Sequence, residues 1–359
     1  MPTAKTAYLV IHGMGEQAPF ETLDQFTRGL TAAMQKASGS GLPPELSHQL
    51  LKRDDWEQSY LAVKQDGVAV ADVYEFYWAY LTVQQAQLSD VATWLTAVIK
   101  GAATYRGLAP QQVWSRVLKF GFVDATLVRL VVAGLHRAES LLRWVLPGFP
   151  DLLIDYLGDV AAYCAPDERS PHFAVRQKII SAGSDLLLTL LRQPQYERII
   201  IVGHSLGSVI AYDLLARVNR RINVEPDLLV LAPKLQGLVT LGSPLDKTAF
   251  FYQQQGDGQD IRSAINTQLY GFRRKLPEAE PVHSDIGNQL GALRWVNFFN
   301  TLDPVSSALE VYSDVLNVDL PSALEHRAWS RLGRAWESHL AYWQSQAMYA
   351  QILQLFPLQ

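Results

Sequence analysis

Short apolar runs alternate with longer amphipathic stretches along most of the chain. Five runs are rich in β-branched or aromatic side chains and bounded by polar or turn residues, which is typical of buried strands. They are residues 7–12, 68–78, 198–202, 237–241 and 293–300. The second run partly alternates between apolar and polar side chains, so we expect it nearer an edge of the sheet.

Apolar side chains at helical spacing fill the intervals between these runs. We predict helices over residues 21–37, 171–191, 206–218 and 327–353, the last broken near Gly333. Strands that alternate with helices predict an α/β fold, with a mostly parallel sheet and helices on both of its faces.

Residues 81–166 do not follow this alternation, although they are rich in Leu, Val and Trp. We predict a helical insertion here, before the strand at 198–202 and within a single domain of residues 1–359. Two interpretations stay open. The insertion is either a plain helical subdomain with its own core, or a cap (lid) that covers the site and binds an acyl chain or a lipid surface.

Charge and composition exclude several classes of protein. The net charge is −4 and no Lys/Arg run stands out, so nucleic acid is not an expected partner. Cys164, as a single cysteine, can form neither an internal disulfide nor a CxxC metal site. No apolar stretch reaches the roughly 18 residues of a membrane-spanning helix. We therefore expect a soluble, cytoplasmic protein without cofactor or metal, and peripheral membrane contact through the insertion stays open.

The strongest chemical signal is Gly203-His204-Ser205-Leu206-Gly207. An apolar strand leads into this segment and a helical pattern leads out, as a nucleophile elbow requires. The two glycines allow close approach of neighbouring backbone, and the helix start directs N–H groups toward a developing oxyanion. The alternative is a tight turn, or a Gly-rich turn that binds phosphate.

His12-Gly13-Met14 closes the first predicted strand. In a hydrolase of this type, an N–H from an early strand-to-helix loop completes the oxyanion hole together with the N–H after the nucleophile. Those donors are expected to be Met14 and Leu206. We interpret His12 as a packed structural histidine.

A serine nucleophile needs a base and an orienting acid, in the chain order Ser, acid, His. Asp303 follows the strand at 293–300 and is the preferred acid, with Asp246 as the alternative. His339 lies in an aromatic cluster and is the preferred base, because His326 lies among charged residues in what looks like a solvated segment. The expected triad is therefore Ser205, Asp303 and His339.

These motifs resemble known lipases. Residues 203–210 with Asp213 resemble the lipase consensus of intracellular phospholipases of the DDHD type, and of inositol-deacylase-like and lecithin–cholesterol-acyltransferase-like hydrolases. His12-Gly13-Met14 and residues 240–244 are similar to segments of true bacterial lipases. Residues 303–305, and residues 338–339 with Tyr342, resemble their acid loop and histidine segment.

The resemblance implies an α/β-hydrolase fold and cleavage of a small-molecule or lipid ester by a lipase, esterase or phospholipase. Two departures limit it. No DDHD tetrad matches, because Asp303 is followed by Pro304, and the insertion matches no known lid. A thioesterase, amidase or acyltransferase with the same triad, and a non-catalytic binding protein of the same fold, stay open as alternatives.

Overall fold

The structure is a computed structural model of the chain. The residues it describes are 5–13, 18–39, 42–52, 57–81, 163, 171–248, 261, 265, 268–269, 271–275, 283–303, 305–320 and 337–358.

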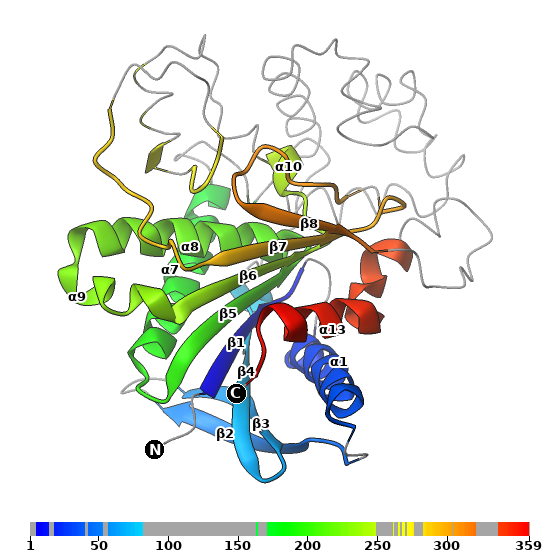
Figure 1. The fold of residues 1–359 in the computed structure, drawn as a ribbon. Helices are drawn as coiled ribbons and strands as arrows, with labels where there is room; N and C mark the ends of the chain where they lie inside the picture. Colours follow the sequence, from blue (N-terminus) through cyan, green and yellow to red (C-terminus); the bar gives the residue numbers. More distant parts are fainter. Residues whose placement is uncertain are drawn as a thin grey trace.

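An eight-stranded mixed sheet lies at the centre of this part of the chain (Figure 1). Its spatial order is β2-β3-β4-β1-β5-β6-β7-β8, and all neighbours from β4 to β8 are parallel, while β2–β3 and β3–β4 are antiparallel. The bounds are β1 Lys5–Ile11, β2 Glu45–Lys52, β3 Glu57–Gln65, β4 Val68–Phe76, β5 Tyr196–His204, β6 Leu235–Leu241, β7 Arg294–Phe299 and β8 Val315–Asp319. The predicted α/β fold with a mostly parallel sheet is confirmed, and the strand order is compatible with an α/β-hydrolase fold.

Helices cover both faces of the sheet, and residues 7–11 of β1 and 199–202 of β5 are continuous apolar runs because both of their faces are buried. Figure 1 shows α1 (Glu21–Ser38) and α13 (Gln346–Leu355) on one face, and α7 (Pro171–Arg192) and α8 (Leu206–Val224) on the other. The shorter helices are α9 Pro226–Leu229 and α10 Leu245–Thr248, and the 3₁₀ turns are η1 Ala79–Leu81, η2 Ala232–Lys234 and η3 Ala341–Gln344.

Side chains along β1 point alternately to the two faces of the sheet, and each set packs in a separate apolar layer between the sheet and the helices. Tyr8 and Val10 belong to the cluster that contains Phe26 of α1, whereas Leu9 and Ile11 belong to the cluster that contains Val209 of α8. The helix that follows β1 therefore covers one face, and the helix that follows the adjacent β5 covers the other. Adjacent parallel strands whose following helices lie on opposite faces form a topological switch point, and open α/β sheets bind ligands at the carboxyl ends of such strands. β1 and β5 form such a switch point.

Three described strands were not predicted, namely β2, β3 and β8. Most side chains of β2 are exposed, and those of β8 are at most half-buried, so neither strand has a buried apolar face that the sequence pattern could reveal. Residues 68–78 were expected nearer an edge of the sheet. β4 is nearer an edge than β1 and β5, although β3 and β2 extend the sheet beyond it.

The described part of the C-terminal region is not one continuous helix. Residues 337–340 are helical, η3 follows, and α13 begins at Gln346, where the Ser345 side chain accepts a hydrogen bond from the Met348 N–H. This break lies after the one expected near Gly333, and Gly333 itself lies outside the described residues.

The predicted insertion lies outside the described residues except for Leu81 and Tyr163, so its interpretation as a cap stays a prediction. Tyr163 donates a hydrogen bond of 2.8 Å to Asp213 Oδ2 on α8, and Arg176 of α7 forms an ion pair with the same oxygen at 2.8 Å.

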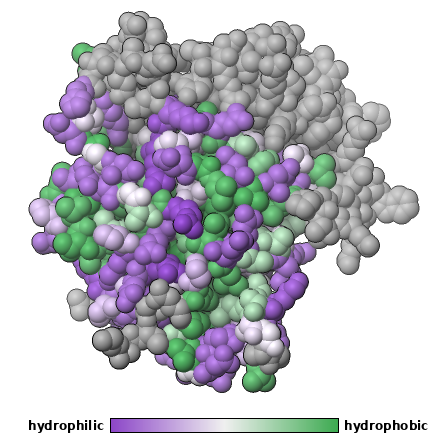
Figure 2. Space-filling view, in the orientation of Figure 1, coloured by the Kyte–Doolittle hydropathy of each residue, from purple (hydrophilic) through white to green (hydrophobic). Residues whose placement is uncertain are grey.

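No described helix is long and apolar enough to cross a membrane. On the face in Figure 2, apolar and polar side chains of the described residues are interspersed, and several apolar ones lie next to one another near the centre of the view.

Candidate active site

Ser205 occupies a strained turn between β5 and α8. Its backbone has φ 53° and ψ −126°, outside the regions that a residue with a Cβ normally adopts. The turn is held by a 2.8 Å hydrogen bond from the Ser205 N–H to the Leu241 carbonyl oxygen. A Cβ at Gly203 would overlap the Gly207 carbonyl, and one at Gly207 would overlap the Ile11 carbonyl, so both positions require glycine.

The structure places Ser205 at the corner between a strand and a helix that the sequence predicted, and the interpretation of this corner as a nucleophile elbow stays a prediction. Leu206 begins α8, and the first N–H groups of a helix have no partner within the helix. Of these groups, the Ser208 N–H donates to the Ser205 carbonyl oxygen at 3.0 Å. The positive end of the helix dipole lies beside Ser205 and favours an anion there.

The end of β1 lies directly against the serine. A Cβ built on Gly13 would be 2.8 Å from Ser205 Cβ and 3.2 Å from the His204 carbonyl oxygen, so a larger residue would push the two segments apart. The oxyanion loop expected from the sequence therefore begins beside the expected nucleophile. Met14, the expected donor in that loop, lies outside the described residues.

His12 is held in one neutral tautomer. Its Nε2 accepts a 3.1 Å hydrogen bond from the Trp78 N–H, so its Nδ1 carries the proton and donates to the Gly13 carbonyl oxygen at 2.7 Å. The imidazole also stacks on the Trp78 ring, with centroids 4.9 Å apart. Burial lowers the pKa of His12 to about 4. This histidine is therefore a packed group that fixes the Gly13 carbonyl.

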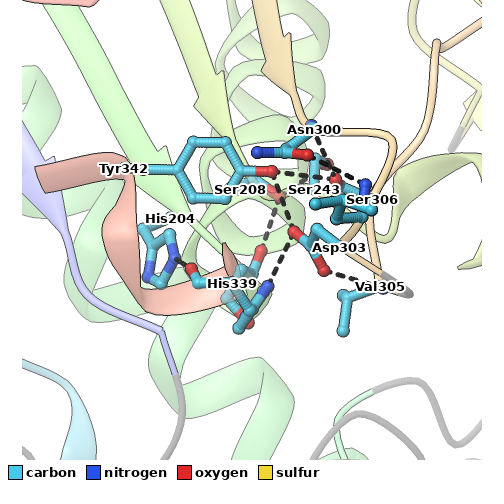
Figure 3. A network of polar contacts seen from close by, with 11 residues as sticks. His204, Ser208, Ser243, Asn300, Asp303, Val305, Ser306, His339 and Tyr342 are labelled. Carbon is cyan, nitrogen blue, oxygen red and sulfur yellow. Dashed lines mark hydrogen bonds and ion pairs between the residues drawn. The ribbon is translucent and has the colours of Figure 1, made fainter. Parts of the chain in front are cut away.

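His339 and Asp303 form a buried pair, although 36 residues separate them (Figure 3). His339 Nδ1 lies 2.9 Å from Asp303 Oδ2, and the two residues are only 2% and 0% exposed. Asp303 follows β7 in a turn in which its N–H donates to the Asn300 carbonyl oxygen at 3.0 Å. The acid and base expected from the sequence are therefore brought together.

Three donors converge on the Asp303 carboxylate. In addition to His339 Nδ1, the Tyr342 hydroxyl donates to Oδ2 at 2.8 Å and the Val305 N–H donates to Oδ1 at 2.9 Å. Burial alone would raise the pKa of Asp303, but attraction to His339 and these hydrogen bonds outweigh it and hold the pKa below its ordinary value. An ionised Asp303 can only accept, so the proton of His339 lies on Nδ1 and its Nε2 is the basic nitrogen.

Tyr342 and Gly242 were not predicted as site residues. The Ser306 hydroxyl lies 2.9 Å from the Tyr342 hydroxyl, and burial raises the pKa of Tyr342 well above its ordinary value, so Tyr342 remains a donor. Gly242 has φ +58°, and a Cβ there would lie 3.1 Å from His339 Cε1 and 2.9 Å from the Tyr342 ring. The signal for Tyr342 was its place in the aromatic cluster around His339.

The residues considered as alternatives for the acid and the base, Asp246 and His326, are not part of the His339–Asp303 pair. Asp246 is the second residue of α10 and is buried. It accepts a hydrogen bond from the Ser307 hydroxyl, so it supports the loop that follows Asp303. His326 lies outside the described residues. Within the described part of the chain, no group of three or more His, Cys, Asp or Glu side chains is arranged to bind a metal ion.

No protein-family model, curated protein or solved structure matches this chain. A function can therefore be inferred only from the arrangement of residues at the carboxyl ends of β5, β6 and β7.

Proposed function

We propose that this protein is a serine hydrolase of the α/β-hydrolase type that cleaves carboxylic esters through an acyl-enzyme on Ser205. One observation carries the proposal, namely the strained turn at Ser205 beside a buried His339–Asp303 pair. Gly242 connects them, because it packs against the His339 ring and follows Leu241, which binds the Ser205 N–H. Fold alone does not define activity, so the proposal rests on this arrangement of residues.

In the proposed reaction, Ser205 Oγ attacks the ester carbonyl carbon and its proton passes to His339 Nε2. Asp303 orients the imidazole and stabilises its charged form. The oxyanion is held by the N–H of Leu206 and, as the sequence predicts, that of Met14. His339 gives the proton to the departing alkoxide, which leaves as the alcohol and forms the acyl-enzyme. Water then attacks the acyl group with His339 as base, so that ester and water become acid and alcohol.

Hydrolysis of p-nitrophenyl esters by wild type and Ser205→Ala tests the proposal. We expect the variant to lose at least about 10⁴-fold in kcat, because the nucleophile is absent. Ser184→Ala is the matched control, since it removes another buried serine hydroxyl, on α7. Retention of wild-type activity by a folded Ser205→Ala variant would refute the proposal.

The class of acyl substrate is decided by a second comparison. Ester, thioester and amide substrates with the same acyl group share the acylation step but differ in the leaving group. We expect the largest kcat/KM for the oxygen ester. A larger value for the thioester or the amide would keep Ser205 as nucleophile and replace the esterase proposal by a thioesterase or amidase.

A further inference from the structure

His204, the residue before the proposed nucleophile, contacts the main chain of the proposed base, His339. Its Nε2 lies 2.9 Å from the backbone carbonyl oxygen of His339, across 135 residues of sequence (Figure 3). The two imidazoles lie 5.0 Å apart at 33°. The contact therefore involves the main chain of His339, whereas Asp303 contacts its side chain.

The protonation state of His204 follows from this partner. A carbonyl oxygen can only accept, so Nε2 of His204 carries a proton and donates it. Burial is the largest effect on this imidazole, followed by the nearby charge of His339, and they lower the pKa of His204 to about 3. His204 is therefore neutral when His339 becomes protonated during the reaction, and it adds no like charge beside it.

His204 is itself rigidly held. It is the last residue of β5, where it pairs with Leu241 of β6, and the backbone of Gly13 packs against its Nδ1 and carbonyl oxygen. Trp343 and Tyr342 pack around its ring, with centroids 5.4 and 5.9 Å away. A rigid strand end therefore supplies the donor that holds the helical turn carrying His339.

The geometry points to His204 as a positioning residue for His339: together with Asp303 it fixes the base at two points, its main chain and its side chain. This inference rests on the proposed function, because it concerns the base of that reaction. A base displaced by about 1 Å can cost roughly 10²-fold in rate. The hydrogen bond from His204 therefore acts on kcat through the position of His339 Nε2.

Two substitutions separate the hydrogen bond from the packing of the ring. His204→Phe keeps an aromatic ring against Tyr342 and Trp343 but removes the donor, and we expect kcat to fall by about 10- to 100-fold with little change in KM. His204→Gln places an amide N–H near the position of Nε2, and we expect it to recover most of the lost rate. Tyr196→Phe is the control, because it removes a 2.7 Å buried hydrogen bond to Asp72 from the opposite end of β5.

A double-mutant cycle with His339→Ala then tests whether His204 acts through His339. The acylation rate of Ser205 is measured by single-turnover ester cleavage in all four backgrounds. If His204 positions His339, His204→Phe lowers the rate in the wild-type background and causes no further loss once His339 is alanine. An equal loss in both backgrounds, or an unchanged rate in His204→Phe, would overturn the inference. Failure of the proposed function itself is a different result, namely no Ser205-dependent cleavage by wild type.

Discussion

Asp303 is completely buried, yet three hydrogen bonds and the neighbouring His339 keep it ionised. Because its folded-state pKa is depressed, Asp303 contributes stability above its unfolded pKa of about 3.9 and loses it as the pH falls toward the folded value. The contribution is therefore fully present at neutral pH, where the proposed triad needs the carboxylate.

Tyr342→Phe removes one of these donors. Hydrogen bonds to charged groups contribute about 1.5–3 kcal/mol, so we expect a loss of that size in the free energy of unfolding at pH 7. We also expect a fall in kcat, because Asp303 loses part of its orientation. Urea denaturation and ester kinetics measure the two effects. Tyr8→Phe is the control, since the buried Tyr8 hydroxyl has no hydrogen-bond partner among the described residues. An equal loss in both variants would contradict the account.

Gly242→Ala tests the space beside the base. The new Cβ would meet the His339 and Tyr342 rings, and φ +58° adds backbone strain. Gly67→Ala is a matched control, because Gly67 has φ +78° and no atom of the described residues lies within 4 Å of a Cβ built there. This variant therefore introduces the backbone strain without a steric contact. We expect Gly67→Ala to lose about 1–2 kcal/mol of stability, and Gly242→Ala to lose more because the steric contacts add to the strain. Only Gly242→Ala is expected to lose at least about tenfold in kcat. Equal activities would argue against close packing of His339 on Gly242.

At the level of elements, a buried ion pair joins α8, the helix that begins directly after Ser205, to its neighbour α7. Arg176 of α7 and Asp213 of α8 are each about 5% exposed, and Tyr163 donates to the same carboxylate. Removal of one partner leaves a buried charge, which typically costs about 3–5 kcal/mol.

Arg176→Met is therefore expected to destabilise the protein by an amount in that range. Arg28→Met is the control, because its i,i+4 pair with Asp24 on α1 is exposed to solvent and its loss should cause no measurable change. The combined variant Arg176→Met/Asp213→Leu should recover part of the stability, because no buried charge remains. Denaturant unfolding of the variants measures these differences. An Arg176→Met variant with an unchanged free energy of unfolding would show that the pair does not hold α7 on α8.

The sequence predicted elements wherever a strand is buried on both faces and a motif closes it. β1, β5, β6 and β7 were found within two residues of their ends, and Asp303 and His339 were selected because the order of the triad follows the order of the strands. Strands without a regular buried face, such as β2, carry no periodic signal. The contacts of His204 with His339 and of Tyr342 with Asp303 were not predictable, because no motif links these distant residues as the order of the triad links Asp303 and His339.

Buried titratable groups determine how the whole molecule responds to pH. Burial lowers the pKa of His12 to about 4 and of His204 to about 3, so between about pH 4 and 6.5 the unfolded state binds more protons at these residues and stability rises with pH. Burial raises the pKa of Glu75 to about 6, which has the opposite sign between about pH 4.5 and 6. Among the described residues, the two histidines outweigh Glu75, so we expect these three groups together to contribute a net rise of stability with pH.

His204→Gln removes one of the two histidine contributions. We expect the slope of unfolding free energy against pH to decrease by up to about 1.4 kcal/mol per pH unit between about pH 4 and 6. Urea denaturation at several pH values measures the slope, and His48→Gln on the exposed surface of β2 is the control. An unchanged slope in His204→Gln would mean that His204 is not buried in its neutral form.

The proposed hydrolysis depends most directly on an activated Ser205. Intact mass spectrometry after treatment with a fluorophosphonate probe measures this property on wild type, on Ser205→Ala and on unfolded wild type. We predict one adduct on folded wild type and none on the other two samples, because only the folded site makes the hydroxyl nucleophilic. No adduct on folded wild type, with or without detergent and lipid, or an equal adduct on Ser205→Ala, would contradict the account.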